Sequence, residues 1–267
     1  MDPEELEARK YLGVKLSYGH NLDCIFSHSD DKLQNPTFVP LFDQLLDGVS
    51  FNQGTRKFRL NQPTNSNRVF ILPKALSIAW VNDTRYWKWI IVTDNRNEVE
   101  APQLIQVSWF DIHGSVKASW LSSRVVYLVA FLVMLTEDAS GWNHHVNLTI
   151  KKPNGCTVET KVSLEGKPKG EFFEVWAGDF ILDNCGCGDS GVVEFGMYEH
   201  GGHWKRGLIV KGVVIRSKAS AGCPHETLSL VQGLNWLRPC NLGQRPQPAV
   251  HLLPQSKASA GCPQANV

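Results

Sequence analysis

The sequence lacks the segments that would place the chain in a membrane or on the secretory route. Its N-terminus, Met-Asp-Pro-Glu-Glu-Leu-Glu, is acidic and has neither the basic start nor the apolar stretch of a secretory signal. The longest apolar run, Val125 to Leu135, is well short of the roughly 20 residues that a membrane-spanning helix needs. We therefore expect a cytoplasmic protein with no membrane span, in which this run is a buried element and the sequons at Asn82 and Asn147 stay unglycosylated.

The chain also lacks an excess of charge of either sign. It has 27 Lys and Arg against 26 Asp and Glu, a net charge of +1 over 267 residues. No global field favours nucleic acid or an anionic membrane, so nothing in the charge supports RNA as a partner. The composition, 42% hydrophobic and 20% charged, is typical of a globular protein with one well-buried domain and extensions, or with two small domains.

Recognisable catalytic signatures are missing or incomplete. We find no Gly-rich phosphate loop and no carboxylate pair in a catalytic setting. Gly188-Asp-Ser190-Gly191 resembles the nucleophile segment of chymotrypsin-like proteases, but Val192 stands where a second Gly is needed, and His113 lacks the neighbours of a catalytic His. A polar loop between strands is the better interpretation. We predict that the chain is not an enzyme and needs no cofactor.

One combination of residues has the chemistry of a zinc site. Cys185-x-Cys187 is followed by His200-x-x-His203. The spacing of the two Cys is tighter than the roughly two to four intervening residues usual in zinc sites, and nothing else supports a metal. We predict no metal site.

From Val69 to Lys218 the pattern is that of a β-protein. Val146, Leu148 and Ile150 alternate with polar residues, which gives a strand one apolar face and one wet face. Several short apolar runs between Gly, Asp and Lys breaks, with no long amphipathic helix among them, predict an all-β sandwich or barrel over residues 69–218.

The two flanking regions differ from this central part. Residues 1–68 predict a partly helical N-terminal extension with a turn at 52–54, a loop at 61–67 and four apolar residues at helical spacing, Leu41, Phe42, Leu45 and Leu46. Residues 219–267 repeat the string Ser-Lys-Ala-Ser-Ala-Gly-Cys-Pro, at 217–224 and 256–263, and predict a disordered tail. Seven cysteines cannot all pair within one chain, and the three in the tail, Cys223, Cys240 and Cys262, are candidates for cross-linking.

Two aromatic segments have the chemistry of a sugar site. In the first, Asn82-Asp-Thr84 is turn chemistry between Trp80 and the pair Tyr86-Trp87. Sugar rings stack their apolar C–H face on aromatic rings and need hydrogen bonds for their hydroxyl and acetamide groups, and this segment offers both. The alternative is that these Trp only fill the core.

The second aromatic segment is 198–207. Gly201-Gly202 predicts a turn that exposes His203, Trp204 and Lys205. The alternative is a Trp that folds back to cap the sandwich. Just upstream, Glu194 and Glu199 are candidates to accept hydrogen bonds from sugar hydroxyls.

The order of these segments resembles the phloem protein 2 lectins, the family of the tobacco agglutinin. The likeness covers about residues 20–218 and is carried by Leu-Ser-Ile-Ala-Trp-Val-Asn-Asp-Thr-Arg-Tyr-Trp-Lys-Trp (76–89), Val-Ser-Trp-Phe-Asp-Ile-His-Gly (107–114) and Trp-Lys-Arg-Gly-Leu-Ile-Val-Lys-Gly-Val-Val-Ile-Arg (204–216). The resemblance implies a jelly-roll-like β-sandwich that binds N-acetylglucosamine oligomers and the chitobiose core of N-glycans without catalysis. The matching sugar-site positions are Trp80 and Trp87. Trp204 and Lys205 loosely resemble a sugar-binding loop of the glycoprotein-binding F-box proteins.

The resemblance also implies a place and partners. Phloem companion cells and sieve elements are the expected location, and chitin oligomers and N-glycosylated proteins the expected ligands. Relatives from phloem exudate form disulfide-linked polymers, so we expect a homodimer or a polymer linked through the tail. A structural, thiol-linked phloem protein with a vestigial sugar site is the main alternative. An F-box adaptor is a weaker one, because residues 1–40 show no clear F-box.

Overall fold

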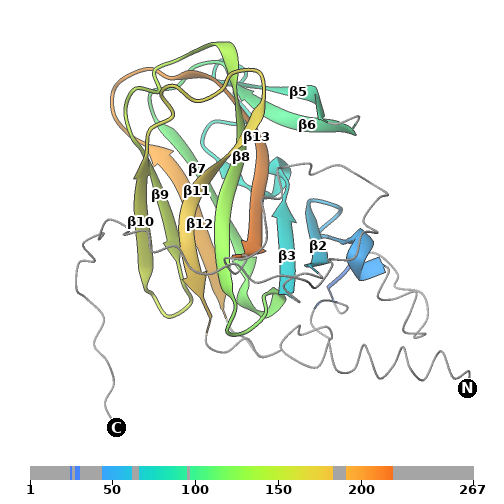
Figure 1. Ribbon diagram of the computed structural model, residues 1–267. Helices are drawn as coiled ribbons and strands as arrows, with labels where there is room; N and C mark the ends of the chain where they lie inside the picture. The colour runs from blue at the N-terminus through green and yellow to red at the C-terminus, as the bar shows by residue number, and fades with distance from the viewer. Residues whose placement is uncertain are drawn as a thin grey trace, which may run out of the picture.

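The computed structural model describes residues 25, 28–30, 44–61, 66–94, 97–182 and 191–218 (Figure 1). The predicted tail with Cys223, Cys240 and Cys262 lies outside the described residues. So do Cys185 and Cys187 of the zinc pattern, the Gly188-Asp-Ser190 segment and most of the region before residue 44.

The described chain folds into two antiparallel sheets packed face to face, so the prediction of an all-β sandwich is confirmed. The larger sheet has eight strands: β1 (Val49–Phe51), β2 (Arg56–Asn61), β3 (Ser66–Ile71), β5 (Trp87–Asp94), β6 (Asn97–Leu104), β8 (Val126–Ser140), β11 (Phe172–Ile181) and β13 (Arg206–Ser217). The smaller sheet has five, in the order β10 (Thr157–Val162), β9 (Val146–Lys151), β12 (Val192–Glu199), β7 (Phe110–Lys117) and β4 (Ser77–Ile78). Two short 3-10 helices, Pro73–Ala75 and Ala118–Trp120, connect strands.

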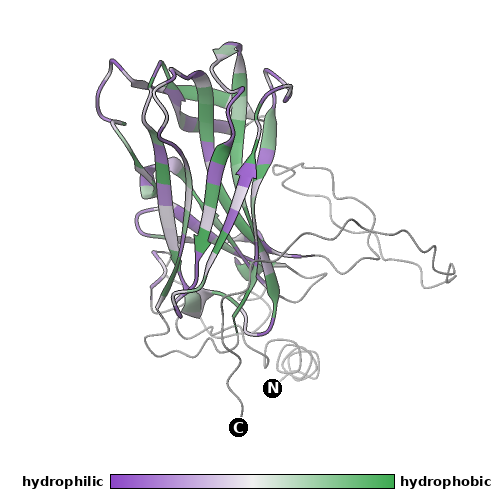
Figure 2. Ribbon diagram, turned by 90° about the vertical axis from the view of Figure 1, so that its left-hand side faces the viewer, coloured by the Kyte–Doolittle hydropathy of each residue, from purple (hydrophilic) through white to green (hydrophobic). Residues whose placement is uncertain are grey.

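The core lies between the two sheets. It forms because apolar and polar residues alternate along the strands, so that each strand turns its apolar face inward. In β9, Val146, Leu148 and Ile150 are fully buried while the residues between them are partly exposed. Figure 2 shows hydrophobic and hydrophilic residues alternating along the strands in this way. Most of the predicted apolar run is buried, between Tyr127 and Leu135, because it lies in β8, which pairs with both β11 and β13; Val126 at its start is 39% exposed. In the described part of the chain, no helix is long and apolar enough to cross a membrane.

The larger sheet extends into the region before residue 69. A helical turn at 44–47 buries Leu45, and β2 pairs along its whole length with β3. The loop predicted at 61–67 is too long, since Ser66 and Asn67 already lie in β3 and are fully buried. Asn67 is accommodated there because its side-chain amide donates to the Trp120 carbonyl at 2.8 Å.

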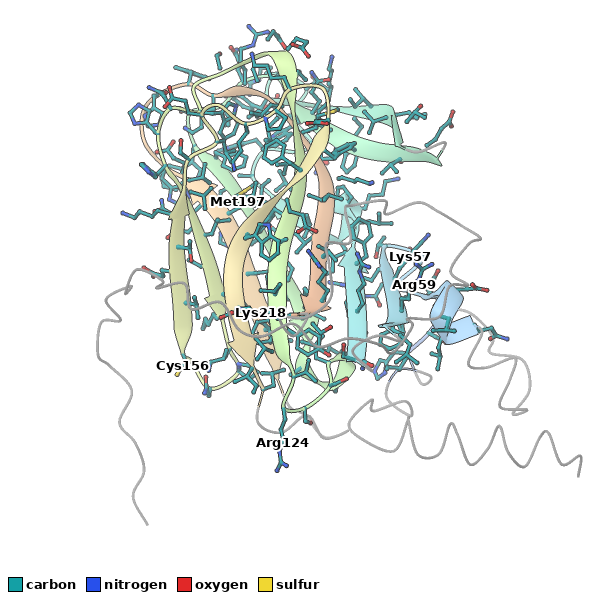
Figure 3. All side chains as sticks on the ribbon, viewed as in Figure 1. Lys57, Arg59, Arg124, Cys156, Met197 and Lys218 are labelled. Carbon is teal, nitrogen blue, oxygen red and sulfur yellow. The ribbon has the colours of Figure 1, made fainter. Side chains whose placement is uncertain are left out.

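Four connections meet at one end of the sandwich, and we call this the loop end. They are the β4–β5 (79–86), β6–β7 (105–109), β8–β9 (141–145) and β12–β13 (200–205) connections. Because neighbouring strands are antiparallel, β4, β8 and β12 end where β7 and β13 begin, at the top of Figure 1. Backbone hydrogen bonds join the connections: Ile105 N–H donates to Tyr86, and Val107 and Lys205 exchange a pair. Cys156, the partly buried thiol after the β9–β10 turn, lies at the opposite end (Figure 3).

Candidate binding site at the loop end

The β4–β5 connection holds Trp80 out toward solvent. The Ala79 N–H donates to the Asp111 carbonyl at 2.9 Å, which extends the pairing of β4 with β7 by one residue. Trp80 then adopts a φ of +64°, a left-handed conformation that is rare for bulky side chains. The turn leaves Trp80 58% exposed beside an open hollow lined by Ile78, Trp80, Val81, Asn82, Asp83 and Thr84. An exposed aromatic ring therefore stands next to amide, carboxylate and hydroxyl groups.

Asp83 is held as a carboxylate in this hollow. Its two oxygens accept hydrogen bonds from the Arg85 guanidinium at 2.6 to 3.1 Å, and one also accepts from the Arg85 N–H at 3.0 Å. These bonds lower the pKa of Asp83 to about 2. The carboxylate is therefore ionised at any pH near neutrality and accepts hydrogen bonds only.

Trp87 and Tyr86 anchor the β4–β5 connection on the core side. Trp87 is only 2% exposed, and its indole Nε1–H donates to the Ala79 carbonyl at 2.9 Å. Tyr86 packs partly buried against the core, with its ring centroid 6.0 Å from that of Trp80. A buried indole offers no free face to a ligand, so of the two predicted Trp only Trp80 is placed to stack on one.

The β12–β13 connection is organised around a buried ammonium group. Lys205 is 1% exposed, and its Nζ donates to the carbonyls of Ser108 at 2.6 Å and His203 at 2.9 Å. It forms an ion pair with Glu199, whose Oε2 is also 2.9 Å from His203 Nε2. Burial by itself raises the pKa of Glu199, but bonding to Lys205 and to the Gly201 N–H outweighs burial and lowers it. The expectation that Lys205 is exposed on the turn is wrong, because the side chain points inward to this carboxylate.

Trp204 is exposed as predicted, while His203 is half-buried. The Trp204 side chain is 58% exposed, and its carbonyl lies against Gly141 of the β8–β9 connection. The His203 ring stacks on His144, with 3.6 Å between centroids. The β8–β9 and β12–β13 connections therefore pack as one unit beneath Trp204.

Glu194 lies apart from these residues. It pairs with Lys151 at 3.2 Å on the outer face of the smaller sheet, and both side chains are about half exposed. It lies five positions before Glu199 along β12, which is about 17 Å at the usual strand rise. The structure therefore brings Trp80, Tyr86, Trp87, Glu199, Trp204 and Lys205 to the loop end and leaves Glu194 outside it.

Trp109 is not among the residues predicted from the sequence, although it is 51% exposed at the loop end. Its ring stacks on His200 of the β12–β13 connection, with 3.9 Å between centroids and 8° between planes. Alternation along β7 carries a signal for it, because Trp109, Asp111 and His113 fall on the face opposite the buried Phe110 and Ile112. Among the described residues, no group of three His, Cys, Asp or Glu side chains is placed to hold a metal ion.

Comparison with known proteins points to one family. The sequence profile of phloem protein 2 matches residues 66–217. A lectin from Luffa acutangula is 36% identical over 209 residues, which cover 78% of this chain and 98% of that protein. Protein PHLOEM PROTEIN 2-LIKE A1 of Arabidopsis thaliana is 37% identical over 203 residues, 74% of this chain and 81% of that protein. A lectin from Coccinia grandis is 35% identical over 150 residues, 55% and 94% of the two chains.

Proposed function

The chain belongs to the phloem protein 2 family, and from that membership we propose that it is a non-enzymatic lectin that binds N-acetylglucosamine oligomers. Relatives that carry the name lectin align with most of their length, which supports a carbohydrate-binding role. The fold agrees with this role, because a rigid sandwich holds several connections together at one end.

The observation that carries the proposal is the exposed Trp80 beside the polar hollow. A pyranose ring has an apolar face that an indole covers, and an N-acetyl group adds a methyl, an N–H donor and a carbonyl acceptor. The Asp83 carboxylate accepts from an N–H or hydroxyl, and the Asn82 amide and Thr84 hydroxyl can donate to a carbonyl. Trp87 and Tyr86 act by supporting Trp80, and Trp204 offers a second exposed ring at the same end.

We propose the following organisation around that site. Residues 69–218 form the lectin domain, 1–68 an N-terminal extension whose strands β1 and β2 and the start of β3 add to the larger sheet, and 219–267 a cysteine-containing tail. Chitin oligomers and the chitobiose core of N-glycosylated proteins are the ligands, and the cytoplasm of phloem companion cells and sieve elements is the place of action. Dimers or polymers would raise a weak affinity per site through avidity.

The test is a calorimetric titration of the full chain, under reducing conditions, with chitotriose and with cellotriose. The two sugars share the linkage and differ by the acetamide groups. We expect saturable binding of chitotriose with a change in Trp fluorescence, and much weaker binding of cellotriose. If neither sugar binds at millimolar concentration, or both bind equally, the proposed specificity is wrong.

One observation favours a second function, a thiol-linked structural protein of the phloem. Cys223, Cys240 and Cys262 all fall in the segment that repeats a small-residue string, and with seven cysteines at least one has no partner available within the chain. On non-reducing gels after oxidation, the full chain should form polymers that a variant with these three cysteines changed to Ser does not form. Cys156→Ser is the matched control and should polymerise like the unchanged chain. Monomers of the unchanged chain under oxidation would contradict this function.

A further inference from the structure

An aromatic ladder crosses the outer face of the smaller sheet next to the Trp80 hollow. It runs from Trp109, just before β7, to His200, just after β12, then to Tyr198 in β12 and to His113 in β7. Trp109 and His200 stack at 3.9 Å, His200 and Tyr198 lie 4.8 Å apart, and Tyr198 and His113 lie 6.2 Å apart. We call these four side chains the aromatic ladder.

The Asp111 carboxylate holds two ladder rings, those of His200 and His113. Asp111 Oδ2 is 2.8 Å from His200 Nε2, and Asp111 Oδ1 is 2.7 Å from His113 Nε2. Since a carboxylate oxygen accepts, each Nε2 carries the hydrogen in these contacts, and each Nδ1 is directed away from Asp111. The rings are therefore fixed before any ligand arrives, which lowers the entropy lost on binding.

The backbone beneath the ladder is shaped to hold it. Gly196 is the register partner of both His113 and Thr149. A Cβ at this position would lie 2.5 Å from His113 Nδ1 and 3.0 Å from the Thr149 hydroxyl. Any larger residue would therefore displace the His113 ring from the sheet. Because Trp109 is 51% and the His113 side chain 50% exposed, both ends of the ladder are open to solvent.

Asp111 connects the ladder to the Trp80 hollow. Asp111, which holds both His rings through its side chain, accepts the Ala79 N–H through its carbonyl, and Trp80 comes next in the chain. Trp109 lies two residues from Asp111 on the other strand of that pair. Both exposed indoles therefore flank the same point at the loop end of one sheet.

From this continuity we infer that the aromatic ladder binds the further residues of an oligosaccharide whose first residue stacks on Trp80. The inference rests on the proposed lectin function and predicts that the affinity increases with the length of the oligosaccharide. Sugar faces stack on the exposed rings, with Trp109 as the largest surface, while the Tyr198 hydroxyl and His200 Nδ1 exchange hydrogen bonds with sugar hydroxyls. The four ladder side chains include no Lys, Arg, Asp or Glu, which suits a neutral ligand.

The test is the affinity of the full chain for chitobiose, chitotriose, chitotetraose and chitohexaose, measured by calorimetry. For the unchanged protein the affinity should rise with length. Trp109→Ala should leave chitobiose binding unchanged and weaken chitohexaose binding about fivefold, the effect of losing one stacked ring. Trp109→Tyr, which keeps an aromatic face, should recover most of the loss. Trp176→Ala is the matched control, because Trp176 is 44% exposed on β11 of the other sheet.

The outcomes separate this inference from the function on which it rests. If the unchanged protein binds no chitin oligomer, the proposed function fails and the inference fails with it. If it binds, but with the same affinity at every length or with Trp109→Ala equal to the unchanged protein, the lectin function stands and the ladder is not a sugar subsite. Thermal unfolding of each variant shows whether it is folded. Should Trp109→Ala be unfolded, His200→Ala replaces it, with the same loss expected for chitohexaose.

Discussion

At the scale of single residues, Glu199 is the group on which the β12–β13 connection depends. Its carboxylate neutralises the Lys205 ammonium, which is almost completely buried, and it also contacts His203 and the Gly201 N–H. Removing one partner of a buried pair leaves the other charge without compensation, and this is much more destabilising than losing an exposed pair. Glu194, on the same strand as Glu199, forms such an exposed pair with Lys151 of the neighbouring strand β9.

We therefore predict different effects for the same substitution at two positions of β12. Glu199→Gln should lower the free energy of unfolding by about 3 kcal/mol. Glu194→Gln should lower it by less than about 0.5 kcal/mol. Urea unfolding at pH 7 measures both. Equal effects would mean that Glu199 does not hold the charge of Lys205.

The same comparison has a pH dependence whose sign follows from the pKa of Glu199. That pKa is lower in the folded state than its ordinary value, so the folded chain releases this proton more readily than the unfolded chain. The contribution of Glu199 is then fully present above the ordinary pKa and is lost as the pH falls through the folded value. The gap in stability between the unchanged protein and Glu199→Gln should shrink below about pH 4.5. A difference in unfolding free energy that stays constant down to the pH at which the protein unfolds would contradict this prediction.

At the scale of elements, the loop end is held together where connections touch through their backbones. Gly141, in the β8–β9 connection, has a φ of +83°, and a Cβ there would lie 2.0 Å from the Trp204 carbonyl. Gly155, in the β9–β10 turn, has the same φ of +83° but open space around it. The two glycines share the conformational requirement and differ only in the close approach.

We predict that Gly141→Ala is the more damaging of the two changes. Both variants carry the strain of a left-handed alanine, about 1 kcal/mol. Gly141→Ala should lose about 2 kcal/mol more, since the backbone at Trp204 must move. Thermal unfolding of the two variants gives the difference. If the two unfold alike, the two connections are not packed as one unit.

The elements themselves were largely predictable and the side-chain environments were not. Alternation predicts β9, and the apolar run predicts that β8 is buried, because burial between two sheets selects both patterns. Ser66 and Asn67 look like loop residues, since the Trp120 carbonyl that accommodates Asn67 is 53 residues away in the sequence. Lys205 looks exposed for the same reason, as its partners come from the ends of β7 and β12.

The candidate site shows the same limit. Trp80 and Trp87 are seven residues apart in one aromatic string, and composition does not separate them. Their difference arises from the left-handed turn at Trp80 and from the extension of β4 along β7, both of which depend on strands distant in sequence. Trp109 could not be identified as a site residue from the sequence, because its stacking partner His200 follows β12 and is distant along the chain. The roles proposed for these residues in sugar binding stay predictions.

At the scale of the whole molecule, the two sheets play different parts. The eight-stranded sheet reaches from β1 to β5 and includes the long strands β8 and β13, which supply much of the core. The five-stranded sheet holds the aromatic ladder on its outer face and the Trp80 hollow at its edge strand β4. With a net charge of +1 the molecule exerts little long-range attraction, so the proposed recognition of a neutral sugar relies on contacts at this surface.

The central claim is that the exposed indole of Trp80 binds N-acetylglucosamine oligomers, and one measurement tests it most directly. It is the affinity of Trp80→Ala for chitotriose by calorimetry, compared with that of Trp176→Ala, an equally large truncation at an exposed site on the other sheet. We predict that Trp80→Ala unfolds at nearly the same temperature as the unchanged protein and binds chitotriose at least about tenfold more weakly, while Trp176→Ala binds normally. A folded Trp80→Ala variant that binds chitotriose as tightly as Trp176→Ala would contradict the claim.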